Sequence, residues 1–268
     1  MSAKGRPERE YRSAQHEGGS VSATTFRPDL FAGKVALVVG GTTGIGAGIC
    51  DALAALGAAV TVTGATAAEC AAARALPGFR GRDAVVLDVR DDHAVAALVE
   101  PLPRLDVLVN CAGIIRRGAE HEVDVFEDVL RVNLTGTMRT CTRARAKLKA
   151  TAGAIVNTAS VLSFFGGGLV PGYAASKGGI AQLTKSLAIA YAADGIRVNA
   201  IAPGWVETPL TTALRDDPQR SAAILARTPL GRWAKPDDIA GAAVFLCSPA
   251  ARFITGAVMP VDGGYMIS

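Results

Sequence analysis

The sequence has few of the residues that build metal sites or disulfide frameworks. Its five cysteines are odd in number, scattered along the chain and in no Cys-x-x-Cys pair. The three histidines, His16, His93 and His121, are far apart and have no partners at ligand spacing. We therefore expect no disulfide framework and no metal ion, and a reducing cytoplasm suits the free thiols best.

Long apolar runs are also missing. No segment approaches the length of a membrane-spanning helix, and residues 1–28 contain no apolar core for a secretory signal. This basic segment is interleaved with Glu8, Glu10 and Glu17, whereas a nucleic-acid arm would be more purely basic. Its composition predicts a mobile tail, and we expect no membrane and no nucleic-acid partner despite the net charge of +4.

Aromatic residues make up only 5% of the 268 residues, but hydrophobic residues make up 50%. From Lys34 onward, short β-branched runs alternate with Ala- and Leu-rich stretches of helical length. The predicted strands are Val35–Val39, Val60–Thr63, Ala84–Asp88, Val107–Asn110, Ala154–Thr158, Arg197–Ile201 and Ala257–Val261. The predicted helices are Ile45–Leu56, Asp91–Val99, Val123–Lys149, Gly172–Ala192 and Pro236–Cys247.

This alternation is typical of βαβ units and of a parallel sheet covered on both faces. We expect an α/β fold of the Rossmann type, with one doubly wound domain of three layers, α/β/α, over residues 29–268. The least regular stretch, about residues 205–235, is expected to form a substrate loop over the carboxyl ends of the strands, where open α/β sheets bind ligands.

A glycine-rich turn follows the first predicted strand and opens a helix. Gly40 can take backbone angles that are closed to other residues, and Gly44 lets the main chain approach a pyrophosphate. Gly46 allows the helix to pack tightly on its strand, and the start of that helix directs free N–H groups at the phosphates. A merely tight strand-to-helix turn is the structural alternative. The context of strand and helix favours a dinucleotide cradle.

Tyr173 and Lys177 lie four residues apart in a predicted helix and so share one face. Free tyrosine, with a pKa of about 10, is a weak acid for chemistry near neutral pH. An ammonium about 4 Å away is worth roughly 4 kcal/mol at an effective dielectric near 20, so we expect Lys177 to lower the pKa of Tyr173 by roughly three units. Such pairs also occur on ordinary exposed helices. Ser160, which follows an apolar strand, favours a pocket shared by all three side chains. Asparagine is unfavourable inside a helix, so the presence of Asn133 in a predicted helix needs a local reason.

The Gly-x3-Gly-x-Gly spacing and the Ser160, Tyr173 and Lys177 set resemble the short-chain dehydrogenase/reductase family over about residues 30–268. The pattern departs at Val39, where the family usually has threonine, and at Cys111, where it has asparagine. The resemblance implies NAD or NADP as cofactor and a homo-oligomer, a tetramer in relatives, whose interface uses the terminal Pro260–Gly264 segment.

The catalytic residues implied by the resemblance are Asn133, Ser160, Tyr173 and Lys177. The cofactor-binding residues are Gly40, Thr42, Thr43, Gly44, Ile45, Gly46, Asp88, Val89, Asn110, Ala112, Gly113, Tyr173, Lys177, Pro203, Gly204, Val206 and Thr208. In this scheme Asp88, at the end of the third strand, contacts adenine. Ser160 binds the carbonyl oxygen, Tyr173 supplies the proton, Lys177 holds the ribose hydroxyls, and Asn133 supports a water in the proton relay.

The expected activity is interconversion of a secondary alcohol and a ketone by hydride transfer. No carboxylate within Val62–Thr66 would repel a 2′-phosphate and no basic residue would attract one, so NAD and NADP both stay open. The segments Ile114–Arg117 and Arg220–Trp233 resemble those of the family branch that oxidises sugar acids such as 2-deoxygluconate. Their arginines could pair with a substrate carboxylate, but exposed, solvated arginines are at least as common.

Two other functions stay open at this stage. One is 3-oxoacyl thioester reduction, with Phe164, Phe165, Leu169 and Val170 around an acyl chain. The other, from a different class, is a non-catalytic sensor of nicotinamide redox state, which the intact Ser160, Tyr173 and Lys177 disfavour.

Overall fold

The computed structural model describes residues 25–79 and 82–268. Most of the expected tail, residues 1–28, lies outside the described residues. Phe26 packs against the core, three residues before the expected start of the folded domain at residue 29. In the described part of the chain, no helix is long and apolar enough to cross a membrane.

The sheet has seven parallel strands in the order β3-β2-β1-β4-β5-β6-β7. The strands are β1 Val35–Val39, β2 Ala59–Gly64, β3 Asp83–Val86, β4 Val107–Asn110, β5 Ala154–Thr158, β6 Arg197–Pro203 and β7 Val258–Val261. The order reverses between β1 and β4, so the loops after these two strands diverge and leave a crevice at their carboxyl ends. The predicted doubly wound Rossmann-type fold is confirmed.

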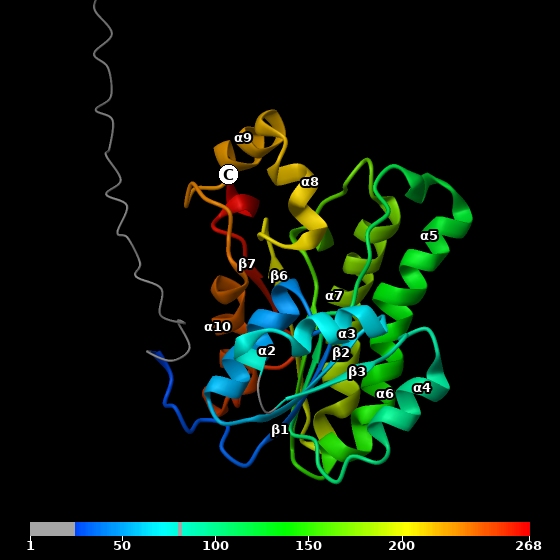
Figure 1. Ribbon diagram of the computed structural model, residues 1–268, viewed down its shortest axis with the longest axis vertical. Coiled ribbons are helices and arrows are strands. Elements are labelled where there is room, and N and C mark those ends of the chain that lie inside the picture. The colour runs from blue at the N-terminus through cyan, green and yellow to red at the C-terminus, as the bar shows by residue number, and fades with distance from the viewer. Residues whose placement is uncertain (1–24, 80–81) are drawn as a thin grey trace, which may run out of the picture.

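Alternate residues of β1 point to opposite faces of the sheet and enter two separate cores. Ala36 and Val38 pack in one core, and Leu37 and Val39 in the other. Figure 1 shows α2 and α10 on the first face and α4, α6 and α7 on the second. The helices are α2 Gly44–Ala55, α3 Ala67–Arg74, α4 Asp92–Val99, α5 Val123–Leu130, α6 Gly136–Lys149, α7 Pro171–Tyr191, α8 Thr212–Arg215, α9 Pro218–Ala226 and α10 Pro236–Cys247.

The long predicted helix Val123–Lys149 is not continuous. A π-helical turn, Arg131–Thr135, separates α5 from α6. Asn133 lies in this turn and is buried. A π-turn inside an α-helix often marks a functional site, and the side-chain bonds of Asn133 described below supply the local reason that the sequence required.

Three short helices were absent from the prediction. Helix α3 follows β2, and α8 and α9 lie within the expected substrate loop, where Figure 1 shows them beside the C-terminus of the chain. Strand β3 ends at Val86, so Asp88 lies two residues beyond the strand and not at its end as predicted. The extra length leaves Asp88 in a turn, where its side chain is free to take an ion pair.

Candidate active site

Two cavities meet at Tyr173. The first, here called the cradle cleft, has a volume of about 510 Å³ and contains the glycine turn, the ends of β2 and β4 and Lys177. The second, the apolar cavity, has a volume of about 450 Å³ and contains Ser160, the Gly166–Gly168 loop and α8. Tyr173, Ile45, Thr158, Thr208 and Leu210 line both. Both volumes suit small-molecule sites. The side chain of Tyr173 therefore faces two neighbouring spaces that could each hold a ligand.

The glycine turn has the close main-chain packing that a pyrophosphate cradle requires. Gly40 has φ +77°, and a Cβ there would lie 2.5 Å from the nitrogen of Ala112. A Cβ on Gly46 would collide with the carbonyl oxygen of Gly40. Helix α2 starts at Gly44 after Thr43, which gives no side-chain cap bond, so first-turn N–H groups remain available to an anion. These residues fit a dinucleotide.

Thr63 supplies the hydrogen bond that Val39 cannot. The family pattern has a threonine before the first glycine, and Val39 has no hydroxyl. Here the main-chain N–H of Gly40 donates to Oγ1 of Thr63, on the neighbouring strand β2, at 3.1 Å. The turn is therefore steadied from another strand.

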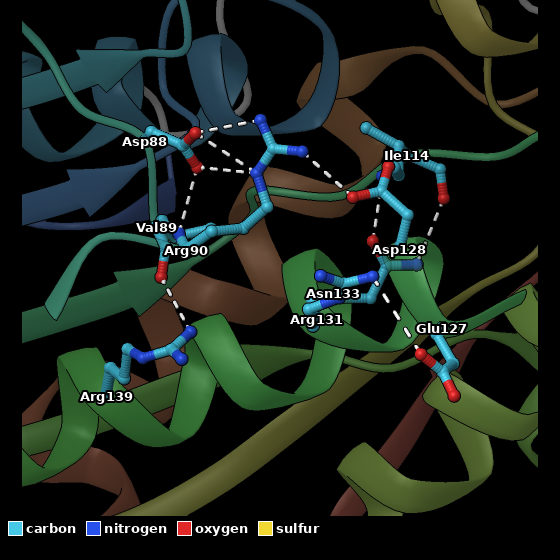
Figure 2. Close-up of polar contacts among 9 residues, drawn as sticks. All are labelled: Asp88, Val89, Arg90, Ile114, Glu127, Asp128, Arg131, Asn133 and Arg139. Carbon is cyan, nitrogen blue, oxygen red and sulfur yellow. Dashed lines mark hydrogen bonds and ion pairs between the residues drawn. The ribbon is translucent and has the colours of Figure 1, made fainter. Parts of the chain in front are cut away.

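Asp88 lies in the cradle cleft as the sequence predicted, with its carboxylate already paired. Arg90 donates to both Asp88 oxygens, with a shortest distance of 2.8 Å, and reaches Asp128 on α5 at 2.9 Å (Figure 2). The hydrogen bonds from Arg90 hold the pKa of Asp88 below its usual value. All three side chains line the cradle cleft, so Arg90 bridges the loop after β3 to α5 along its wall.

Asn110 is the predicted cofactor residue that lines neither cavity. Its amide is buried and bonds Asn157 at 2.9 Å and Thr140 at 2.7 Å, in a network beneath the sheet edge. Its neighbours Ala112 and Gly113 do line the cleft. Cys111, the other departure from the family pattern, contacts the Thr158 hydroxyl at 3.2 Å.

Asn133 uses its whole side chain to brace the loop after β4. Its Oδ1 accepts from the N–H of Ile114 at 2.8 Å, and its Nδ2 donates to the Ile114 carbonyl at 3.0 Å and to Ser176 on α7 at 3.0 Å. Figure 2 shows Asn133 turned toward Ile114. Both Nδ2 hydrogens are used, but Oδ1 accepts one bond and has two lone pairs, so a relay water can bind this side chain only as a donor to Oδ1.

Lys177 is buried and bound to the main chain. Its ammonium donates to the Thr158 carbonyl at 2.6 Å and lies 5.5 Å from the centroid of the Tyr173 ring. Burial lowers the pKa of Lys177 to about 8, against a smaller opposing effect of Cys111. The cation and the phenol therefore share one pocket, as the four-residue spacing predicted.

The predicted direction of the Tyr173 pKa is wrong for this structure. Burial raises the pKa of the phenol, Ser160 opposes that rise by hydrogen bonding, and the charge of Glu120 adds to it. The ammonium of Lys177, which is bound to the Thr158 carbonyl, is not among the groups that shift the pKa of Tyr173.

Ser160 projects into the apolar cavity beside Tyr173. Its Oγ accepts from the N–H of Leu162 at 3.2 Å, and its own N–H donates to Ser163 Oγ at 3.2 Å. Ser163 Oγ in turn donates to the carbonyl of Lys177 at 2.6 Å. Because Ser160 Oγ accepts locally, its O–H stays available as a donor.

The apolar cavity carries arginines and no acidic side chain. Arg117 and Arg227 line it. Burial, and then repulsion from Arg220, lower the pKa of Arg117. Arg227 stacks 4.3 Å from the ring centroid of Tyr265. Within residues 25–79 and 82–268, no carboxylate forms an ion pair with any of these three arginines.

The remaining wall of this cavity contains most of the other residues that the sequence analysis singled out. Pro203, Gly204, Val206 and Thr208 line it, as do Phe165, Leu169 and Val170. Phe164 does not and is half-exposed. The expected substrate loop contributes through Leu210, Thr211 and Leu214.

Two acidic residues at the site were not foreseen. Glu69 lines the cradle cleft and accepts from the N–H of Ala65 at 2.7 Å; the Thr66-x-x-Glu69 spacing of a capping box is the signal that could have found it. Glu120 is 1% exposed and bonds the N–H of Tyr173. No local pattern marks Glu120, because its partner lies 53 residues away. Among the described residues, no cluster of three His, Cys, Asp or Glu could hold a metal ion.

Comparison with known proteins agrees with this geometry. A family model described as enoyl-(acyl carrier protein) reductase matches residues 39–266. The chain is 45% identical over 244 residues to 2-dehydro-3-deoxy-D-gluconate 5-dehydrogenase of Pseudoalteromonas atlantica, covering 87% of this chain and 96% of the relative. It is 43% identical over 246 residues to cis-4-hydroxycyclohexanecarboxylate dehydrogenase of Sinomonas cyclohexanicum, covering 88% and 98%.

A solved structure gives the same result. A protein of Agrobacterium tumefaciens with the provisional designation 2-deoxy-D-gluconate 3-dehydrogenase was crystallised with bound NADP. It superposes with a TM-score of 0.82 at 42% identity, covering 91% of this chain and 100% of that one. The chain belongs to the short-chain dehydrogenase/reductase family, and it is an NAD(P)-dependent enzyme that interconverts alcohols and ketones.

Proposed function

We propose that the protein oxidises a hydroxy acid, or reduces the corresponding keto acid, at a secondary carbon that is remote from the carboxylate. The observation that carries this proposal is the composition of the apolar cavity. Tyr173 and Ser160 stand at one part of its wall, and Arg117 and Arg227, without acidic partners in the described chain, at others. Both arginines are exposed residues, but guanidinium groups that face a cavity without an acidic partner favour a carboxylate, which they bind through charge-assisted hydrogen bonds.

The residues of the chain would divide the chemistry between them. In the reduction direction, Ser160 donates a hydrogen bond to the carbonyl oxygen and stabilises its developing negative charge. Tyr173 then donates its phenolic proton to the same oxygen, and in oxidation it accepts that proton back. Lys177 holds ribose hydroxyls beside the phenol, and Asn133 keeps the Ile114 loop against α7 and supports the relay.

The cradle cleft would hold NAD or NADP, which supplies or accepts the hydride. The main-chain groups around Gly40, Gly44 and Gly46 would bind the pyrophosphate, and Asp88 and Val89 would lie at the adenine end. Pro203, Gly204, Val206 and Thr208 would border the nicotinamide. The junction of the two cavities at Tyr173 supports this placement.

The substrates named for the two relatives support a defined spacing. One is a gluconate derivative oxidised at carbon 5, and the other is a cyclohexanecarboxylate oxidised at carbon 4. In both names, three carbon atoms separate the carboxylate carbon from the carbon that reacts. We propose the same spacing for the substrate of this chain, with the carboxylate at Arg117 and the reacting carbon at Tyr173.

A second candidate is reduction of a 3-oxoacyl thioester. The apolar side chains of Leu162, Phe165, Leu169 and Leu214 in the cavity favour it, as does the acyl-carrier-protein description of the matching family model. The arginines count against it, because a neutral acyl chain offers them no anion.

Turnover assays on a substrate panel test the two candidates. The panel contains 2-dehydro-3-deoxygluconate, 4-hydroxycyclohexanecarboxylate, a polyol without a carboxylate and acetoacetyl thioester, each with NAD and NADP. The proposal expects the two acids to give the highest kcat/KM. Preference for the thioester would favour the second candidate, and preference for the polyol would exclude the carboxylate site.

We also propose that the enzyme is a homotetramer of the cytoplasm. All five cysteines are free, which suits a reducing compartment. Phe253 and Ile189 are 100% and 81% exposed, and exposed large apolar side chains favour burial against another subunit. Light scattering at several protein concentrations measures the subunit number, and fractionation of cells measures the compartment.

A further inference from the structure

Helix α7 begins without a cap of its own. The residue at its N-cap is Val170, which has no side-chain acceptor, and Pro171 at the first position has no N–H. Free N–H groups in a first turn must find acceptors elsewhere when they are buried. The third residue of this turn is Tyr173 itself, so the support of its backbone decides where the phenol lies.

Glu120 supplies the missing acceptor from a distant turn. It lies in the 3-10 turn Ala119–His121 and is 1% exposed. Its Oε2 accepts from the N–H of Tyr173 at 2.7 Å, and its Oε1 accepts from the N–H of Arg116 at 2.7 Å. Both oxygens are therefore engaged in short, charge-assisted hydrogen bonds to main-chain donors.

The same turn has two further bonds to the segment that precedes α7. The N–H of Gly118 donates to the carbonyl of Leu169 at 2.7 Å, and Nε2 of His121 lies 2.9 Å from the carbonyl of Gly168. Gly168 and Leu169 line the apolar cavity. Arg117, which follows Arg116 just before the turn, lines it as well. The turn thus joins two walls of the apolar cavity, and Glu120 is the buried residue of that turn.

We propose that Glu120 is a positioning residue for the reaction. Its buried carboxylate holds the first turn of α7 and the segment Arg116–His121, which contains Arg117, in one fixed arrangement. This inference rests on the proposed function for its effect on turnover. Its geometric part, the fixing of Tyr173 by a carboxylate, is independent of which substrate the enzyme takes.

The charge of Glu120 has a second consequence at the phenol. The ionisable side chains that face this pocket include Lys177 on α7, Cys111 after β4, Glu120, and the arginines Arg117 and Arg227. Burial raises the pKa of Cys111 to about 11, so its thiol carries no charge near neutral pH. After burial, Glu120 is the group that raises the pKa of Tyr173. Removing this charge should lower the pKa of the phenol.

The first test replaces Glu120→Gln, which keeps the shape but can accept only one of the two hydrogen bonds. We expect kcat to fall about 10- to 100-fold, because small misplacements of a catalytic group cost that much. We also expect the rising limb of the oxidation rate against pH, where Tyr173 loses its proton, to move to lower pH. Glu122→Gln removes the same charge from an exposed residue two positions along and should leave both quantities unchanged.

The second test needs no substrate. Ultraviolet titration of the phenol, as the difference between each protein and its Tyr173→Phe version, should give a lower pKa in Glu120→Gln than in the parent. An unchanged or higher pKa, or wild-type kcat in Glu120→Gln, overturns the inference. If the parent turns over no substrate, the proposed function fails, but this titration still decides the role of Glu120.

The variant Glu120→Asp covers the case in which Glu120→Gln does not fold. It keeps the charge but is one methylene too short to reach both N–H groups. We expect the phenol to titrate as in the parent while kcat falls. Wild-type kcat in Glu120→Asp would contradict the positioning role.

Discussion

The ammonium of Lys177 donates a hydrogen bond of 2.6 Å to the main-chain carbonyl of Thr158. This bond fixes a buried cation at the carboxyl end of β5, 5.5 Å from the centre of the Tyr173 ring. A buried lysine with no carboxylate partner is costly to the fold. The protein keeps it at the junction of two ligand cavities, which is the arrangement expected where a site is selected for chemistry and not for stability.

Lys177→Met should stabilise the fold while abolishing turnover. The pKa of Lys177 falls from 10.5 to about 8 on folding, which corresponds to about 3 kcal/mol against the folded state at pH 7. Between about pH 8 and pH 10.5, Lys177 holds its proton in the unfolded chain but has lost it in the folded protein. The free energy of unfolding of the parent therefore rises with pH over this range. Urea denaturation should therefore show a stabilisation at pH 7 that shrinks near pH 10.

Lys185→Met is the matched control for that variant. Lys185 is exposed on the same helix, so its replacement should change the free energy of unfolding by less than about 0.5 kcal/mol. A Lys177→Met protein that is less stable than the parent at pH 7 would show that the Thr158 bond outweighs the desolvation of the ammonium.

Arg117→Met should weaken the binding of acids and spare neutral substrates. A lost hydrogen bond to a charged group is worth about 1.5–3 kcal/mol, so KM for a hydroxy acid should rise about 10- to 100-fold. KM for a polyol without a carboxylate should stay unchanged, as should both values in the exposed control Arg252→Met. An equal loss for acid and polyol would assign Arg117 a structural role.

Glu69→Gln should shift cofactor preference toward NADP. Glu69 lines the cradle cleft just beyond β2, where an acidic residue binds the ribose hydroxyls of NAD and repels a 2′-phosphate. We expect the ratio of the Kd for NADP to the Kd for NAD to fall about 10-fold, a change of roughly 1.4 kcal/mol. Fluorescence titration measures both constants. Glu127→Gln, outside the cleft, should keep the parent ratio, and an unchanged ratio in Glu69→Gln would rule out this role.

Asp106→Asn should destabilise the fold most at neutral pH. Desolvation opposes ionisation of Asp106, but hydrogen bonds from Arg104, the Val35 N–H and Lys34 outweigh it and lower the pKa. A carboxyl with a lowered folded pKa contributes stability above its unfolded value, near pH 4, and loses it as the pH falls through the folded value. We expect a loss of about 1–3 kcal/mol at pH 7 that disappears in acid. The control Asp29→Asn should lose much less stability, because its ion pair with Arg27 is exposed and screened by solvent.

The sequence predicted those features that local patterns determine. Strands such as β1 are short apolar runs between turns, and the cradle glycines need a main-chain geometry that only glycine adopts. Tyr173 and Lys177 are one helical turn apart, so their shared pocket followed from spacing alone. The short helix α9 was missed because its C-terminal end is held from a distant segment, as in the bond from Ser268 to the carbonyl of Arg227. Helix α8 was missed because it is a single turn that packs against α9.

What the sequence could not predict depends on burial and on distant partners. The direction of the Tyr173 pKa reversed because burial of the phenol raises its pKa more than the hydrogen bond with Ser160 lowers it. The acceptor for the Tyr173 N–H comes from Glu120, and the acceptor for the Gly40 N–H in the cradle comes from Thr63 on another strand. Residues brought together by the sheet topology leave no spacing pattern in the chain.

Tyr173→Phe tests the central claim most directly, with turnover and cofactor binding measured on the same protein. The account predicts that the Kd for reduced nicotinamide cofactor stays within about two-fold of the parent, because the cradle is untouched, while kcat falls by about 10²- to 10⁴-fold, as for loss of a general acid. Tyr191→Phe, on the same helix but outside both cavities, should retain activity. Near-parental kcat in Tyr173→Phe would contradict the assignment of the phenol as the proton donor.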